Sequence, residues 1–113
     1  MSHVTGGGLA VNLARVLPAE LVATVDRGTW TPQPVFDVVR RVGPVAQPDL
    51  ERTLNCGVGM LALTAADDVD RAIALLDGHG IRAWVCGQVS ATSASVEEPA
   101  GGSVRMTGQH PGW

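Results

Sequence analysis

Hydrophobic residues recur along the first half of the chain with two periods, and each period predicts a different kind of element. In residues 9–17 the apolar positions follow i, i+4, i+7 and i+8, which predicts an amphipathic helix that ends at Pro18. Residues 21–25 (LVATV) are rich in β-branched side chains between two acidic residues, which predicts a strand. Residues 35–43 predict a second helix. Its apolar stripe, expected to be buried, consists of Val35, Val38, Val39 and Val42.

The second half of the chain alternates strand-like and helix-like segments. After a short helix that begins near Pro48, the apolar segment 56–64 predicts a buried strand. Residues 67–80 predict a helix, with acidic residues in its first turn. On the outer face of this helix, Asp67 and Arg71 are expected to pair at i, i+4. The apolar positions of its other face are Val69, Ala72, Ile73 and Leu76.

Two further strands and a loop complete the pattern. Residues 81–89 and 103–107 predict strands, and residues 108–113 predict a tail. Between the strands, residues 91–102 are rich in Ser, Ala, Glu, Pro and Gly, which predicts a mobile loop. The order helix, strand, helix, strand, helix, strand, strand predicts an α/β or α+β fold. We expect a layered sandwich in which helices cover a sheet of about four strands.

Composition and charge narrow the function classes. With 113 residues, 45% of them hydrophobic and 17% charged, the chain predicts one globular domain over residues 1–113. The chain has 8 basic residues, all arginines, and 11 acidic ones. It therefore lacks the excess of positive charge that is typical of a nucleic-acid-binding protein. No apolar run approaches the roughly 18 residues of a membrane span, and the first residues do not resemble a secretory signal. A soluble cytoplasmic protein is therefore expected.

Residues 5–8 (TGGG), the glycine loop, lead directly into the first predicted helix. Exposed amides in a glycine-rich turn, next to the positive end of a helix dipole, favour binding of an anion or a phosphate group. Thr5 would add a hydroxyl donor, and Asn12 lies one to two turns further along. The loop lacks both the lysine of a P-loop and the spaced glycines of a dinucleotide-binding motif. A flexible entry loop without a ligand is the alternative interpretation.

A second glycine-spaced turn, NCGVG at residues 55–59, precedes the apolar segment 56–64. Asn55 and Gly57 would contact a ligand in the functional interpretation, but the sequence favours a bulge or tight packing against a helix as the reason for the glycines. His3 flanks the glycine loop and is a further candidate. The histidines are not spaced as metal ligands, and the acidic residues before the helix at 67–80 fit its dipole, so no metal site is predicted. No arrangement of catalytic residues can be identified.

Four segments in sequence order resemble one known family. They are HVTGGGLAVNLARVLP, TWTPQPVF, ERTLNCGVGM and AWVCGQV. Together they are similar to the C-terminal domain of the phosphoribosylformylglycinamidine cyclo-ligase (aminoimidazole ribonucleotide synthetase) family. Two positions depart from the family pattern: Leu54 stands where an aromatic residue is usual, and Gln33 stands where the first of two prolines is frequent. Both changes concern packing or loop conformation, so they affect the expected fold little.

The resemblance implies ATP-dependent ring closure of formylglycinamidine ribonucleotide to aminoimidazole ribonucleotide in de novo purine synthesis. It also implies a partly ferredoxin-like C-terminal domain, a homodimer, and ATP and magnesium bound mainly by an N-terminal domain. The cleft between the two domains would then hold the ribonucleotide substrate. Positions that would bind its phosphate-bearing group, or part of the nucleotide, are Thr5, Gly6, Gly7, Gly8 and Asn12. Weaker candidates for the same cleft are His3, Asn55 and Gly57.

Because the chain starts at the signature of the C-terminal domain, the N-terminal ATP-binding domain is expected to be absent and the piece alone inactive. We also expect a lone domain of this kind to self-associate through apolar surface. One alternative is the corresponding domain of a related ATP-dependent enzyme, such as formylglycinamidine ribonucleotide synthase, selenophosphate synthetase or thiamine-monophosphate kinase. Another is a non-enzymatic module that binds a phosphate-containing ligand.

Overall fold

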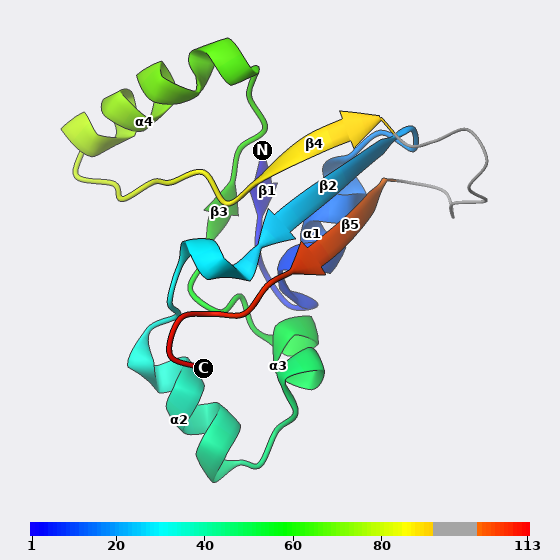
Figure 1. The fold of residues 1–113 in the computed structure, drawn as a ribbon, viewed down its shortest axis with the longest axis vertical. Coiled ribbons are helices and arrows are strands. Elements are labelled where there is room, and N and C mark those ends of the chain that lie inside the picture. Colours follow the sequence, from blue (N-terminus) through cyan, green and yellow to red (C-terminus); the bar gives the residue numbers. More distant parts are fainter. Residues whose placement is uncertain (92–101) are drawn as a thin grey trace.

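A computed structural model describes residues 1–91 and 102–113 of the chain (Figure 1). The helices are α1 (Gly8–Val16), α2 (Pro34–Val42), α3 (Gln47–Thr53) and α4 (Val69–Gly78). The strands are β1 (Ser2–His3), β2 (Leu21–Asp26), β3 (Met60–Leu61), β4 (Gly87–Ala91) and β5 (Ser103–Thr107). Two short 3-10 turns, η1 (Arg27–Thr29) and η2 (Ala66–Asp68), precede Trp30 and α4.

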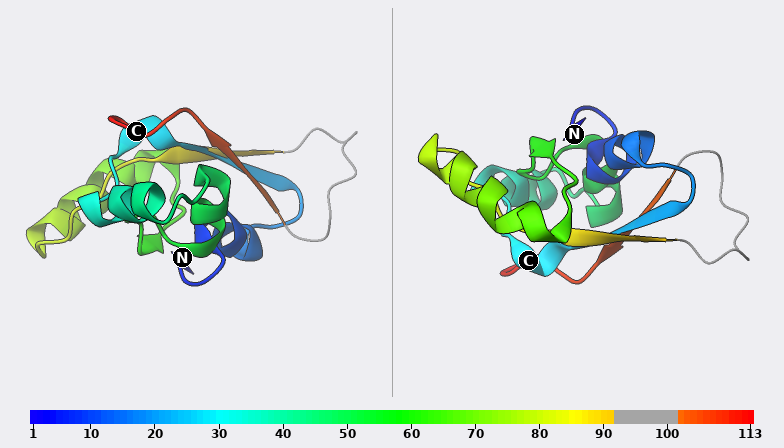
Figure 2. Two further views of the ribbon diagram at one scale, coloured as in Figure 1. Left: turned by 90° about the horizontal axis from the view of Figure 1, so that it is seen from below. Right: turned by 90° about the horizontal axis from the view of Figure 1, so that it is seen from above.

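The strands form two sheets. In the three-stranded sheet β2 lies in the centre, with β4 antiparallel on one side and β5 parallel on the other. Val25 of β2 is paired with Gly87 of β4 and with Met106 of β5. The short strands β1 and β3 pair separately and antiparallel. Figure 2 shows α1 and α3 on one side of the larger sheet. The expected mixed fold with helices packed on a sheet is therefore confirmed, with its strands divided between two sheets.

The hydrophobic core lies between α1 and the central strand. Leu9, Leu13 and Leu17 repeat every four residues and are all at most 5% exposed, so three of the four positions in the predicted stripe are buried. Ala23 and Val25 of β2 form the opposite wall, each 2% exposed. Val16, by contrast, was expected in the stripe and faces solvent, because it lies beside the core-facing row rather than on it.

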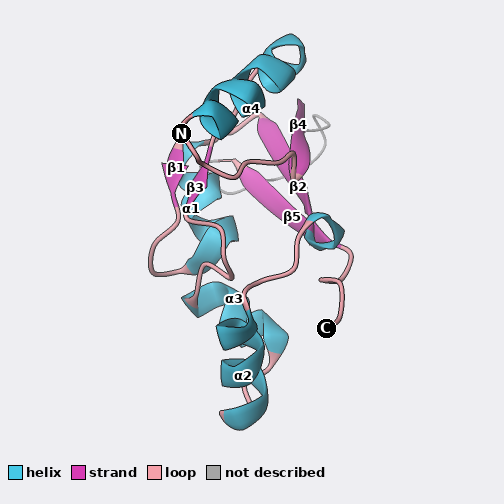
Figure 3. Ribbon diagram, turned by 90° about the vertical axis from the view of Figure 1, so that its left-hand side faces the viewer, coloured by secondary structure: helices cyan, strands magenta, loops and turns pink. Residues whose placement is uncertain are grey.

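The predicted burial of the α2 stripe is wrong. The helix forms with Pro34 in its first turn, as expected, but its four valines are between 39% and 78% exposed. They are Val35, Val38, Val39 and Val42. The period of apolar residues identifies which side chains share a helix face, whereas burial requires a partner surface. The described residues leave this face uncovered, and Figure 3 shows α2 and α4 at opposite ends of the molecule.

Several other predicted boundaries also change. The strand expected over residues 56–64 shrinks to Met60–Leu61, because a tight turn occupies residues 55–58. The strand expected over 81–89 begins only at Gly87. Helix α4 and strand β5 are confirmed, but Arg71 pairs with Asp68 at 3.0 Å rather than with Asp67.

The mobile loop expected over residues 91–102 falls mostly on residues 92–101, which lie outside the described residues; Ala91 itself ends β4. None of the helices in the described part of the chain has the length and apolar character needed to span a membrane.

Candidate functional site

The glycine loop connects β1 to α1 and is fixed at both ends by backbone hydrogen bonds. The Val4 amide donates to the Gly59 carbonyl oxygen at 3.0 Å, and the Gly8 amide donates to the Thr5 carbonyl oxygen at 3.2 Å. Gly7 is the N-cap of α1 and is partly exposed, and Gly6 has open space where a side chain would be. The amide end of α1 therefore follows a loop whose tip is open to solvent.

Gly8 is a glycine because α1 packs closely against α3 at this position. Its φ is +82°, and a Cβ at this position would lie 1.7 Å from the carbonyl oxygen of Glu51 in α3. Only glycine combines that backbone angle with so close an approach. The third glycine of the loop thus brings α1 and α3 together.

Asn12 lies behind the glycine loop and holds it from the inside. The side chain is 6% exposed, and its Nδ2 donates to the carbonyl oxygens of Thr5, Gly6 and Gly8 at 3.2, 3.3 and 2.7 Å. Its Oδ1 accepts from Thr5 Oγ1 at 3.2 Å and from Arg15 Nη1 at 3.3 Å. Because the amide is fully used by the protein, Asn12 supports the loop conformation and turns these carbonyl groups inward.

The second glycine-spaced segment forms a hydrogen-bonded turn at residues 55–58. The Val58 amide donates to the Asn55 carbonyl oxygen at 3.1 Å, and the Gly57 amide donates to Asn55 Oδ1 at 2.9 Å. Both central residues have positive φ, 50° at Cys56 and 96° at Gly57, as in a type I′ turn. A Cβ on Gly57 would lie 2.4 Å from Gln33 Oε1. Gly57 therefore packs tightly against the Gln33 side chain and does not line the depression described next.

An open depression of about 360 Å³ lies where the two glycine segments meet. Thr5 and Gly6 form one side, and Asn55 with the end of α3 forms the other. Phe36 of α2 completes the lining, together with Val4, Thr53 and Leu54. Three of the sequence-predicted residues therefore come together here. The other candidates lie behind or beside this surface: His3, Gly7, Gly8, Asn12 and Gly57. Phe36 was not predicted as a site residue, although it ends the TWTPQPVF segment that carries the family resemblance.

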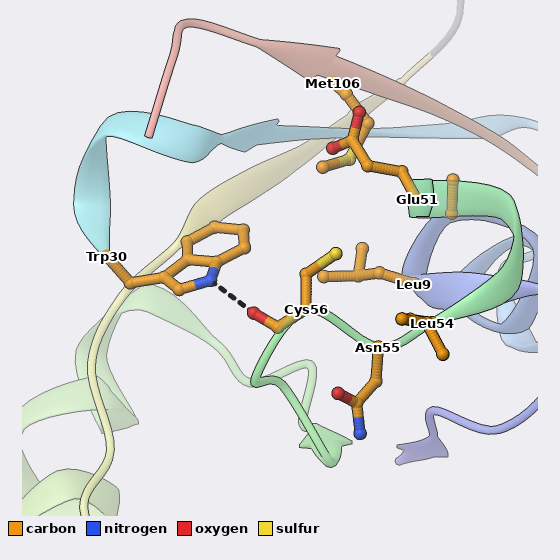
Figure 4. A pocket seen from close by; sticks show the side chains of 8 residues that line it. Leu9, Trp30, Glu51, Leu54, Asn55, Cys56 and Met106 are labelled. Carbon is orange, nitrogen blue, oxygen red and sulfur yellow. Dashed lines mark hydrogen bonds between the residues drawn. The ribbon is translucent and has the colours of Figure 1, made fainter. Parts of the chain in front are cut away.

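A smaller pocket of about 20 Å³, enough for a single water molecule, lies next to the depression and shares Leu54 and Asn55 with it. Figure 4 shows Cys56 among the side chains that line it, with Trp30 Nε1 donating to the Cys56 carbonyl oxygen at 3.1 Å. Burial and, to a smaller extent, the nearby Glu51 carboxylate raise the pKa of the Cys56 thiol to about 11, against a lowering effect of Arg27. A thiol with this pKa keeps its proton near neutral pH, so packing explains Cys56 better than nucleophilic chemistry.

An ion pair joins η1 to α3, the helix whose end lines both pockets. Arg27 donates to the two carboxylate oxygens of Glu51 at 2.8 and 3.0 Å, and both side chains are less than 20% exposed. Such a two-point contact between a guanidinium and a carboxylate restricts orientation as well as distance. It ties η1 to α3, the helix whose backbone also touches Gly8.

The histidines separate into exposed and buried ones. His3 is exposed on β1 beside the glycine loop, and His79 is exposed after α4. His110, expected in a tail, is only 2% exposed and lies against Trp30 at a ring-centroid distance of 4.7 Å. Among the described residues, no group of three or more His, Cys, Asp or Glu side chains could hold a metal ion.

Comparison with known proteins agrees with the sequence pattern. The family model described as AIR synthase related protein, C-terminal domain, matches residues 1–98. A putative phosphoribosylformylglycinamidine cyclo-ligase of Streptomyces fradiae is 50% identical over 109 residues, which are 96% of this chain and 59% of that protein. The phosphoribosylformylglycinamidine cyclo-ligase of Symbiobacterium thermophilum is 43% identical over 101 residues, 89% of this chain and 27% of its own length. The chain thus spans less than two thirds of the relatives that it matches.

Proposed function

Because this chain belongs to the AIR synthase related family, whose C-terminal domain it matches over residues 1–98, we propose that it supplies one half of a cyclo-ligase active site. The reaction would be ATP-dependent closure of formylglycinamidine ribonucleotide to aminoimidazole ribonucleotide, as the family resemblance implies, and the relatives are named as phosphoribosylformylglycinamidine cyclo-ligases. The observation that carries the proposal is the meeting of Thr5, Gly6 and Asn55 at one open depression beside the start of α1.

The role proposed for this chain is to bind and orient the phosphate-bearing end of the ribonucleotide. Asn12 turns the loop carbonyl groups inward, so that the amides at the tip of the loop and the dipole of α1 are available to a negative charge. Thr5 and Asn55 line the same surface; the Thr5 hydroxyl hydrogen already goes to Asn12 Oδ1, so Asn55 supplies the side-chain donor to the substrate. The depression is open to solvent and, at about 360 Å³, has room for part of a small molecule.

In the proposed reaction ATP transfers its terminal phosphoryl group to the formyl oxygen of the substrate. The amidine nitrogen then attacks the activated carbon, so that a carbon–nitrogen bond forms and the carbon–oxygen bond to the departing phosphate breaks. Among the described residues, no group of three or more His, Cys, Asp or Glu side chains could hold a metal ion. We assign nucleotide and metal binding to a second domain, as the family resemblance implies.

That second domain is the partner proposed for this chain, and homodimerisation through it is part of the same proposal. The relatives are longer than this chain, which leaves room for such a domain in them. The uncovered valine stripe of α2 provides an apolar surface against which another domain could pack. On its own, the chain is expected to have no cyclo-ligase activity.

The test is reconstitution from two parts. The chain is mixed with the part of the Symbiobacterium thermophilum relative to which this chain does not align. Formation of aminoimidazole ribonucleotide is then measured in the presence of ATP and magnesium. Gly6→Asp places a negative charge at the open loop tip, whereas Gly59→Asp places the same charge at another open glycine outside the depression.

We expect activity with the wild-type chain and with Gly59→Asp, and at least a tenfold higher KM with Gly6→Asp. Equal KM values for the two variants would contradict the proposed site. A wild-type chain that binds the ribonucleotide but gives no product with any partner would favour the non-enzymatic phosphate-binding module instead.

A further inference from the structure

The C-terminal residues 108–113 lie beyond the part of the chain that the family model matches, yet they pack against the body of the protein. Gly108 accepts a hydrogen bond from Arg27 Nη1 at 3.2 Å, and the Pro111 carbonyl oxygen accepts one from Thr31 Oγ1 at 3.3 Å. Within the segment, the Trp113 amide donates to the His110 carbonyl oxygen at 3.1 Å. These contacts make residues 108–113, here called the C-terminal strap, an ordered element.

His110 connects the strap to the turn at residues 55–58. Its Nδ1 lies 3.1 Å from the Arg27 carbonyl oxygen and 3.2 Å from that of Trp30. Because both neighbours are acceptors, Nδ1 carries the hydrogen and donates. The His110 and Trp30 rings meet edge to face, and Trp30 in turn donates its Nε1 hydrogen to the Cys56 carbonyl oxygen (Figure 4). The strap therefore fixes the indole that holds the Asn55 side of the depression.

Trp113 connects the strap to α2. The Arg40 guanidinium lies over the Trp113 ring, with its central carbon 4.8 Å from the ring centroid, and Trp113 packs edge to face on His110 at 4.9 Å. Arg40 stands four residues after Phe36, which lines the depression, so the two side chains lie on neighbouring turns of one face of α2. The Arg40–Trp113 contact therefore attaches α2 to the C-terminal segment, whereas the outer valines of the helix are exposed.

We propose that the C-terminal strap is a positioning element of the candidate site. His110 and Trp113 are its two positioning residues, and neither lines the depression. Through Trp30 the strap sets the 55–58 turn, and through Arg40 it sets α2 and the Phe36 ring. The identity of the ligand in this inference rests on the proposed function. The coupling of the strap to the 55–58 turn and to Phe36 is argued from the contacts alone.

The coupling is tested first without any ligand. Backbone amide NMR shifts are compared between the wild-type chain and Trp113→Ala, with Gln109→Ala, an exposed neighbour in the strap, as the matched control. We expect Trp113→Ala to shift the amides of Phe36 and Gly57, and Gln109→Ala to leave them in place. Trp113→Phe retains a ring for Arg40 and should restore the wild-type positions. Unmoved Phe36 and Gly57 amides in folded Trp113→Ala would overturn the proposal.

A second arm uses His110 and formylglycinamidine ribonucleotide. His110→Leu removes both the donor at Nδ1 and the ring that packs on Trp30, whereas His110→Asn removes the ring but retains a donor at the δ position, so His110→Leu should weaken binding of the ribonucleotide more than His110→Asn, by about three- to tenfold relative to wild type. If the wild-type chain binds no ribonucleotide but Trp113→Ala shifts the amides, the proposed function is refuted and the positioning role of the strap is supported. If every variant binds the ribonucleotide tightly and the amides do not move, the proposed function is supported and the positioning role of the strap is refuted.

Discussion

Alanine substitutions at the three glycines of the glycine loop should destabilise the protein increasingly from Gly6 to Gly8, because each glycine has a different environment. At Gly6 no atom lies within 4 Å of the added methyl group. At Gly7, φ is +99° and the nearest atom is Val11 Cγ1 at 3.4 Å, an ordinary contact. At Gly8 the positive φ is combined with a distance of 1.7 Å to the Glu51 carbonyl oxygen.

These environments translate into separable free energies of unfolding. Gly6→Ala should change stability by no more than about 0.5 kcal/mol, as at an ordinary surface position. Gly7→Ala should lose roughly 1–2 kcal/mol from the left-handed backbone alone. Gly8→Ala adds the displacement of α1 from α3, a further 1–3 kcal/mol or so, for a total of about 2–5 kcal/mol. That total is a large share of the roughly 5–15 kcal/mol that stabilises a typical domain.

Urea unfolding followed by tryptophan fluorescence measures the series, since Trp30 is only 5% exposed in the folded chain. With a slope of about 1–3 kcal/mol per molar urea, Gly8→Ala should lower the midpoint by on the order of 1–2 M. Gly6→Ala is the internal control for any general effect of alanine in the loop. If Gly8→Ala unfolds within 0.5 kcal/mol or so of Gly6→Ala, the close approach of the two helices is refuted.

Three further predictions concern the frame and the surface. Glu51→Gln should lower the free energy of unfolding by about 1–3 kcal/mol, because it weakens the two-point contact with Arg27; equal losses in wild-type and Arg27→Met backgrounds would argue against that contact. Burial raises the pKa of the Cys56 thiol from 9.0 to about 11, so the unfolded thiol ionises first and stability should fall between about pH 9 and pH 11. Cys56→Ala should flatten that fall, and an unchanged pH profile would contradict the assignment. Val38→Glu combined with Val42→Glu should reduce self-association in sedimentation velocity without lowering the urea midpoint, unless the wild-type chain is already monomeric at all concentrations.

The local elements of this fold could be predicted because they depend on short-range patterns. The core stripe of α1, the β-branched strand β2 and the proline-started α2 all follow from the order of neighbouring residues. What the pattern could not provide is the tertiary environment of each element. The valines of α2 have the spacing of a buried face, yet they are exposed, whereas His110 in a polar tail is buried by two tryptophans.

In the candidate site, too, the local turns could be predicted from the sequence, whereas the tertiary contacts could not. The sequence placed Thr5, Gly6 and Asn55 on two glycine-containing turns, and the depression brings these three residues together. Asn12 was expected to face a ligand, but helical geometry places it under the loop, where one amide group binds several backbone carbonyls. The close approach of Gly8 to α3 depends on a contact between residues far apart in the chain, which local patterns do not encode.

Titration of the purified chain with formylglycinamidine ribonucleotide and, separately, with ATP, followed by backbone amide NMR, tests the central claim most directly. The account predicts saturable shifts at Gly6, Gly7 and Asn55 with the ribonucleotide, absent with ATP, while the amides of α4 stay unmoved. Shifts at these amides only with ATP would assign the loop to the nucleotide. No shift at these amides with saturating ribonucleotide would contradict the proposed phosphate site.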